Sequence, residues 1–239
     1  MYFGLSEDQI FFQDNVKKFL EDNAPLDAVK KITEGADLST KDELHQGLIN
    51  LGINNILIPE ENGGLGLDLL FASAVSQSLG EGIATLPFVG PYVIAPIAIK
   101  YGASDSQKEK LFNEMSQNLI NYGVGFSEYF GSRDSSELSI SNNKITGRTL
   151  FVLDVDFASH VMLCDKKGQI GLVSLESKGI EVIDLTTVDK TRTYKEMIFK
   201  DTPIEILDKT KTSTEAAEMA LSAGRIVAAA DSLGASQAM

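Results

Sequence analysis

The sequence has few of the residues that disulfides and metal centres require. Cys164 is the single cysteine, so no disulfide can form within the chain, and a cysteine-rich zinc site is excluded. The two histidines, His45 and His160, lie far apart, and neither belongs to an H-E-x-x-H or H-x-H pattern. We therefore expect no metal centre.

Basic residues and long apolar runs are also scarce. The chain carries 21 Lys and Arg against 34 Asp and Glu, a formal net charge of -13. Such an acidic chain is repelled by phosphate backbones and anionic lipids, so we expect neither nucleic-acid nor membrane binding. The longest apolar stretch, residues 86–99, contains three prolines and is too short to span a bilayer. The N-terminal residues lack the basic and apolar regions of a secretory signal, so we expect a cytoplasmic protein.

The first 120 residues have the pattern of a helical domain. Capping boxes at Ser6–Gln9, Thr40–Glu43 and Ser104–Gln107 each precede apolar residues at helical spacing, and Asp68 can cap a fourth helix. Residues 1–120 are therefore predicted to form an N-terminal all-α bundle.

Near Asn121 the pattern changes to short segments rich in Val, Ile, Phe and Thr, separated by turn residues. The predicted strands are 122–126, 138–140, 144–146, 150–153, 160–164, 170–175, 180–183 and 194–199. Strands this short and closely spaced predict a small antiparallel β-barrel or sandwich over residues 121–208. The fold class is thus multi-domain, with α and β parts.

After Pro203 the pattern is helical again. A capping box at Thr212–Glu215 is followed by an alanine-rich run that continues to Met239. A helix of this composition suits close helix–helix contact, so it docks either on the rest of this chain or on another subunit. Asp231 within it is expected to face solvent or an arginine.

Several local strings resemble the acyl-CoA dehydrogenase family. Leu51–Leu67 is similar to the family's L-G…P-E-E-x-G-G-L-G segment, and this is the most specific match. Residues 125–134 resemble the T-E-P-x-x-G-S-D segment, and Ala223–Arg225 resembles the start of the family's third domain. The resemblance covers the whole chain but only about the first two thirds of the family's architecture. It makes residues 209–239 the first helix of a truncated C-terminal helical domain.

The resemblance implies a flavoprotein that oxidises an acyl-CoA thioester. In this family FAD is bound between the β-domain and the helices, a carboxylate abstracts the alpha proton, and the flavin accepts the beta hydride. The implied partners are the acyl-CoA substrate, an electron-transfer flavoprotein, and a homo- or hetero-oligomer formed through the C-terminal helix.

Carried over onto this sequence, the resemblance assigns cofactor-binding positions. Ser127 and Glu128 stand at the flavin ring, although the Ser127 hydroxyl could instead satisfy a local backbone group. Either Arg133 or Ser132 stands at the flavin phosphates, depending on a one-residue gap, and Arg133 could instead form a surface ion pair. Leu150, Phe151 and Val152 occupy the place of the aromatic-Ile-Thr triplet that flanks the flavin, so Phe151 and Val152 are assigned to the cofactor.

The resemblance leaves the catalytic base unassigned. Arg225 matches a substrate-binding arginine, but the preceding position, which carries the base in some members, is Gly224. Two hypotheses follow: a dehydrogenase completed by a further C-terminal portion or a partner, or a non-catalytic companion subunit of a heteromeric dehydrogenase. A third is an acyl-CoA or acyl-carrier binding module without redox chemistry.

Overall fold

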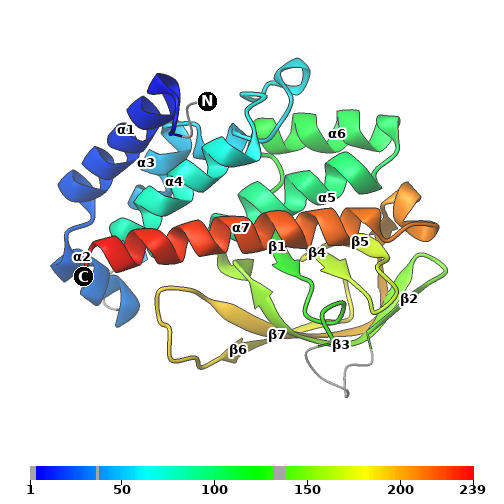
Figure 1. The fold of residues 1–239 in the computed structure, drawn as a ribbon. Coiled ribbons are helices and arrows are strands. Elements are labelled where there is room, and N and C mark those ends of the chain that lie inside the picture. Colours follow the sequence, from blue (N-terminus) through cyan, green and yellow to red (C-terminus); the bar gives the residue numbers. More distant parts are fainter. Residues whose placement is uncertain (1–3, 36–37, 132–137) are drawn as a thin grey trace.

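The computed structural model describes residues 4–35, 38–131 and 138–239. It consists of a layer of helices and a β-sheet, with the long helix α7 lying along the boundary between them (Figure 1). The helices are α1 (Glu7–Asn23), α2 (Leu26–Thr33), α3 (Leu38–Asn50), α4 (Leu69–Glu81), the π-helical segment η3 (Val89–Ile94), α5 (Ala95–Gly102), α6 (Asp105–Ser116) and α7 (Glu215–Gln237). None of the helices in these ranges combines the length and apolarity needed to cross a membrane.

Three of the predicted helix starts, at Ser6, Asp68 and Ser104, are confirmed. Those at Thr40 and Thr212 are wrong. The Ser6 hydroxyl accepts from the Gln9 backbone N–H at 3.2 Å, and the Gln9 side chain accepts from the Ser6 N–H at 2.9 Å. The same reciprocal box stands at Ser104 before α6. At Thr40 the prediction is wrong, because α3 already begins at Leu38 and the predicted box lies inside the helix. At Thr212 it is wrong because α7 begins at Glu215, with Thr214 as its N-cap.

The strands form one mixed sheet in the order β6-β7-β3-β1-β4-β5-β8, with β2 added beside β3. The strands are β1 (Tyr122–Gly125), β2 (Ser139–Ser141), β3 (Lys144–Leu153), β4 (His160–Cys164), β5 (Ile170–Ser174), β6 (Ile180–Leu185), β7 (Tyr194–Pro203) and β8 (Glu205–Ile206). Most neighbours are antiparallel, as expected, but β1 and β4 run parallel. Two segments predicted as separate strands are one irregular strand, β3, whose pairing with β7 shifts register twice.

Helix α7 docks on the rest of the chain. Its small side chains enter two apolar clusters: Ala216, Ala217 and Ala220 pack with α5 and the sheet, whereas Ala223 and Val227 pack among the N-terminal helices. The crossing with α4 is very close, because a Cβ on Gly234 would lie 1.9 Å from the Gln77 carbonyl oxygen. Helix α7 therefore joins the helical and sheet layers, while the proposed domain boundaries at residues 120 and 208 remain a prediction.

Candidate functional site

An apolar cavity of about 340 Å³ lies where η3, the sheet and α7 meet. The volume lies at the lower end of the range for small-molecule sites, which is roughly 300–1,000 Å³. The lining residues from the helical side are Val89, Ile94, Leu221, Gly224, Arg225 and Ala228, and those from the sheet side are Val124, Phe126, Ser127, Phe130, Phe151 and Leu153. Three residues singled out from the sequence, Ser127, Phe151 and Arg225, are thus brought together.

The Ser127 hydroxyl satisfies a local backbone group, whereas its place at the flavin ring stays a prediction. Ser127 lines the cavity just beyond the end of β1, and its hydroxyl donates to the Leu150 carbonyl oxygen at 2.6 Å. The Thr149 hydroxyl lies 3.4 Å away.

Glu128 is buried beside Ser127, with 4% of its surface exposed. Its Oε2 atom has no hydrogen-bond partner among the described residues. Burial raises the pKa of the Glu128 carboxyl, and Lys166 together with hydrogen bonds from Thr149 and Ser127 partly opposes that rise. An unpaired buried carboxylate oxygen is costly, so this atom is available to a donor.

Phe151 and Val152 occupy opposite surroundings although they are neighbours in β3. Phe151 has a positive φ of 57°, lines the cavity, and meets the Tyr194 ring edge-on at 6.2 Å. Val152 is fully buried among the apolar side chains within the sheet domain and does not line the cavity.

The remaining predicted positions lie at the mouth of the cavity or beyond the described residues. Arg225 places its guanidinium 5.2 Å from the centre of the Phe130 ring, a cation–π distance. Ser132 and Arg133 lie outside the described residues.

No carboxylate lines the apolar cavity within the described part of the chain. At the position where some relatives carry the base, a Cβ on Gly224 would lie 2.9 Å from the Ile94 side chain, so α7 approaches η3 closely there. The part of the lining that the structure describes therefore offers no carboxylate to abstract a proton.

Sequence reasoning missed a buried titratable cluster behind the cavity. Asp154, which follows the lining residue Leu153, has φ 61° and packs its Oδ2 atom against Gly90. Burial raises the pKa of Asp154 to about 6, although the charges of Arg192 and Lys41 lower it. The signal available in the sequence was an acidic residue directly after an apolar strand.

His45 and Tyr92 form the other half of this cluster. The His45 Nε2 atom and the Tyr92 hydroxyl are 2.8 Å apart. Burial lowers the pKa of His45 to about 4, so the imidazole is neutral at physiological pH. Burial, aided by the Asp154 charge, raises the pKa of the Tyr92 phenol, so this group stays protonated.

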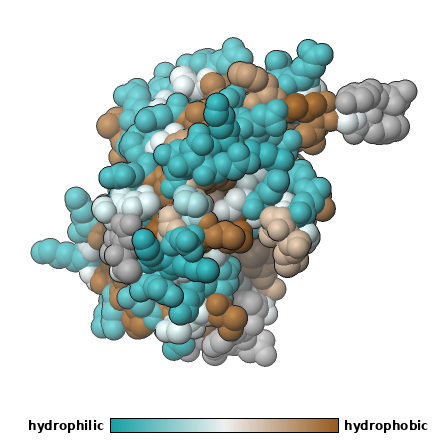
Figure 2. All heavy atoms as spheres, turned by 90° about the vertical axis from the view of Figure 1, so that its left-hand side faces the viewer, coloured by the Kyte–Doolittle hydropathy of each residue, from teal (hydrophilic) through white to brown (hydrophobic). Residues whose placement is uncertain are grey.

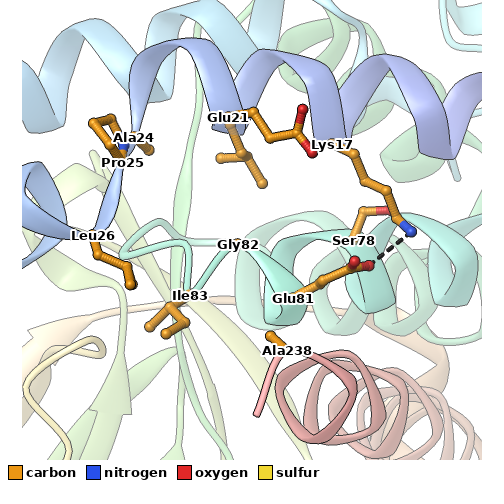
Figure 3. A pocket seen from close by; sticks show the side chains of 11 residues that line it. Lys17, Glu21, Ala24, Pro25, Leu26, Ser78, Glu81, Gly82, Ile83 and Ala238 are labelled. Carbon is orange, nitrogen blue, oxygen red and sulfur yellow. Dashed lines mark ion pairs between the residues drawn. The ribbon is translucent and has the colours of Figure 1, made fainter.

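A second cavity, of about 360 Å³, opens near Ala238, where α1 and α4 end and α2 begins (Figure 3). Lys17 and Glu81 pair across it at 2.7 Å, and Leu26 and Ile83 point toward it from the other side. Figure 2 shows the end of the molecule that carries α1 and α2 as mainly hydrophilic, with hydrophobic residues in small groups. Besides this ion pair, the described lining includes the carboxylate of Glu21.

The chain is similar to known proteins both in sequence and in structure. Residues 6–118 match the family model described as the acyl-CoA dehydrogenase N-terminal domain. No curated protein matches the chain. Butyryl-CoA dehydrogenase from Megasphaera elsdenii is similar in structure, with a TM-score of 0.81 at 20% identity over 100% of this chain and 68% of that chain.

Two further solved structures have a similar fold. A glutaryl-coenzyme A dehydrogenase in complex with glutaryl-CoA matches with a TM-score of 0.78 at 18% identity, over 100% of this chain and 66% of that one. A variant of the steroid ACAD Tcur3481-Tcur3483 matches with a TM-score of 0.80 at 19% identity, over 97% of this chain and 64% of that one. The chain thus spans about two thirds of the length of these structures.

The helical half, the sheet and α7 together define the acyl-CoA dehydrogenase fold. Residues 6–118 carry the sequence signature of the acyl-CoA dehydrogenase N-terminal domain, and the whole chain shares the fold of the acyl-CoA dehydrogenases.

Proposed function

We propose that this chain binds FAD and an acyl-CoA thioester and takes part in the alpha,beta-dehydrogenation of that thioester. The observation that supports the proposal is the apolar cavity of about 340 Å³ between α7 and the sheet. Phe130 and Phe151 line this cavity and leave it open. Bound FAD would supply the hydride acceptor for the reaction.

The residues of the cavity fit a planar aromatic ring beside an acyl chain. Phe151 offers an aromatic wall, and Ser127 offers a hydroxyl at the sheet side. Glu128, buried beside Ser127 and outside the described lining, has an Oε2 atom without a described partner. Arg225 is the charged residue of the described lining, and its N–H groups can bind the oxygens of a thioester or phosphate. The surrounding apolar side chains exclude water from the bound acyl group.

Titration of the purified chain with FAD tests the proposal. We expect saturable binding, measured by quenching of flavin fluorescence. The Ala228→Trp variant, which fills the cavity from α7, should weaken binding at least tenfold, whereas Ser232→Trp, on an exposed part of the same helix outside the lining, should not. A chain that fails to take up FAD, or equal binding by both variants, would contradict the proposal.

A companion subunit in a heteromeric dehydrogenase is the second candidate. It is favoured by the lack of a carboxylate in the described cavity lining and by an apolar stripe on α7. Met219, Ile226 and Leu233 recur every seven residues along α7 and are 40%, 52% and 53% exposed. This spacing is that of a helix–helix seam, so it supports an oligomer formed through α7.

The two candidates differ in what activity requires. A chain that oxidises acyl-CoA when loaded with FAD alone would exclude the companion role. Activity that appears only with a second polypeptide, and is lost in Ile226→Glu but kept in Ser232→Glu, would support it. An electron-transfer flavoprotein as electron acceptor and a cytoplasmic location belong to the same proposal.

A further inference from the structure

A polar cavity of about 560 Å³ lies beneath α6, against the sheet. It shares no lining residue with the apolar cavity described above. Lys110 and Glu114 reach it from α6, Tyr122 and His160 from the first residues of β1 and β4, and Glu205 from β8. These residues are far apart in sequence and are brought together only by the docking of α6 on the sheet.

Two oxygen atoms at this cavity are buried without partners. Tyr122 is 1% exposed, and its hydroxyl has no hydrogen-bond partner among the described residues. The Glu114 Oε2 atom is buried and unpartnered in the same part of the structure. Leaving such groups unpaired is expensive, at about 1–3 kcal/mol for each neutral group and more for a charge. The pair therefore points to a ligand that satisfies both.

The charge around the cavity is negative. Glu114 and Glu205 contribute two carboxylates, against the single ammonium of Lys110, which pairs with Glu205 at 3.3 Å. His160 adds no positive charge, because burial lowers the pKa of its imidazole, and its Nδ1 atom contacts the Ser159 hydroxyl at 3.0 Å. Burial first, and then the charges of Glu114 and Glu205, raise the pKa of the Tyr122 phenol, so its hydroxyl is neutral.

The apolar side chains that line the cavity favour a ligand that also has an apolar part. Leu111, Ile120, Leu172 and Ile204 supply apolar surface next to the acidic groups. Within the described residues no group of three or more His, Cys, Asp or Glu side chains could hold a metal ion. A cation with its own N–H donors and an apolar body fits these facts better than a bare metal ion.

We propose that this cavity binds a small protonated alkylamine, with the ammonium group between Glu114, Glu205 and Tyr122 and the alkyl chain against the apolar lining. An ammonium carries three N–H donors and no acceptor, which matches three oxygen acceptors. Anions are repelled by the carboxylates, and neutral alcohols lack the charge that Glu114 requires. This site shares no lining residue with the cavity proposed for flavin and acyl-CoA.

Isothermal titration of the full chain with n-butylamine at neutral pH tests the site, with n-butanol and butyrate as matched neutral and anionic probes. Saturable binding of butylamine, with no binding of the other two, is expected. Butylamine that fails to saturate, or butanol binding equally well, would overturn the proposal.

Variants localise the binding. Glu114→Gln and Tyr122→Phe should each weaken butylamine binding about tenfold or more, the loss expected for a hydrogen bond to a charged group. Glu109→Gln removes the same charge from an exposed position of α6 outside the cavity and should leave binding unchanged. Lys110→Met removes the competing ammonium and should tighten binding. Binding that survives both Glu114→Gln and Tyr122→Phe in folded protein would refute the assignment.

Discussion

Replacing Asp154 by asparagine should stabilise the protein, and by more at high pH than at low pH. Asparagine keeps the shape of the side chain and tolerates the left-handed backbone at this position, where φ is 61°. Burial raises the pKa of Asp154 from 3.8 to about 6, so the folded state holds its proton more tightly than the unfolded state. Above pH 6 both states are ionised, and the buried charge reduces stability.

The size of the effect follows from the pKa shift. At about 1.4 kcal/mol per pKa unit, the rise from 3.8 to about 6 corresponds to about 3 kcal/mol at pH 8. The stability that the protonated carboxyl provides is complete below pH 3.8 and is lost as the pH rises through 6. The gain in the asparagine variant should therefore be about half as large at pH 5.

Urea unfolding followed by circular dichroism at pH 5 and pH 8 measures both values. Asp156→Asn is the matched control, because Asp156 is exposed and pairs with Lys195 at 2.7 Å. We expect Asp156→Asn to change stability by less than about 1 kcal/mol. A gain in Asp154→Asn that does not depend on pH, or a loss of stability at pH 8, would show that the Asp154 carboxylate is well solvated or well paired.

Three other substitutions test separate parts of the structure. Tyr122→Phe removes a buried hydroxyl without a described partner and should raise the free energy of unfolding by about 1 kcal/mol in urea titrations; a decrease would show that the hydroxyl is satisfied. Gly234→Ala should lower the free energy of unfolding by about 3 kcal/mol, because the added Cβ would collide with the backbone of α4. The control Ser232→Ala should change it by less than about 0.5 kcal/mol. Equal melting temperatures of the two variants would contradict the close crossing of α7 and α4. Arg192→Met breaks a 2.9 Å ion pair with the partly buried Asp231 and should lower the free energy of unfolding in urea by about 1–2 kcal/mol. An unchanged free energy of unfolding would show that the pair is solvated.

Local chemistry made part of the fold predictable. Ser6 and Gln9 lie within one turn of each other, so their reciprocal bonds can be inferred from spacing alone. Thr40 shows the limit of that inference, since the same pattern lies inside α3. The pattern predicts two strands over 144–146 and 150–153, whereas β3 is continuous through Gly147, where φ is 111°.

Contacts between distant segments account for what the sequence could not specify. Asp231 was expected to face solvent or an arginine, and it meets Arg192, 39 residues earlier, because the segment between β6 and β7 lies beside α7. The opposite surroundings of Phe151 and Val152 likewise depend on which side of β3 faces α7. The burial of Asp154 and the cavity beneath α6 arise only when helices and sheet dock.

Helix α7 follows in chain order all the described elements on which it packs. Ala217, Ala223 and Val227 cover apolar surfaces of α4, α5 and the sheet. During synthesis these surfaces are therefore made before α7 and stay exposed to solvent until α7 has been made. Partly made chains that expose such surfaces are prone to aggregate. We expect nascent chains stalled before residue 215 to bind chaperones, and that binding to end once this helix has left the ribosome.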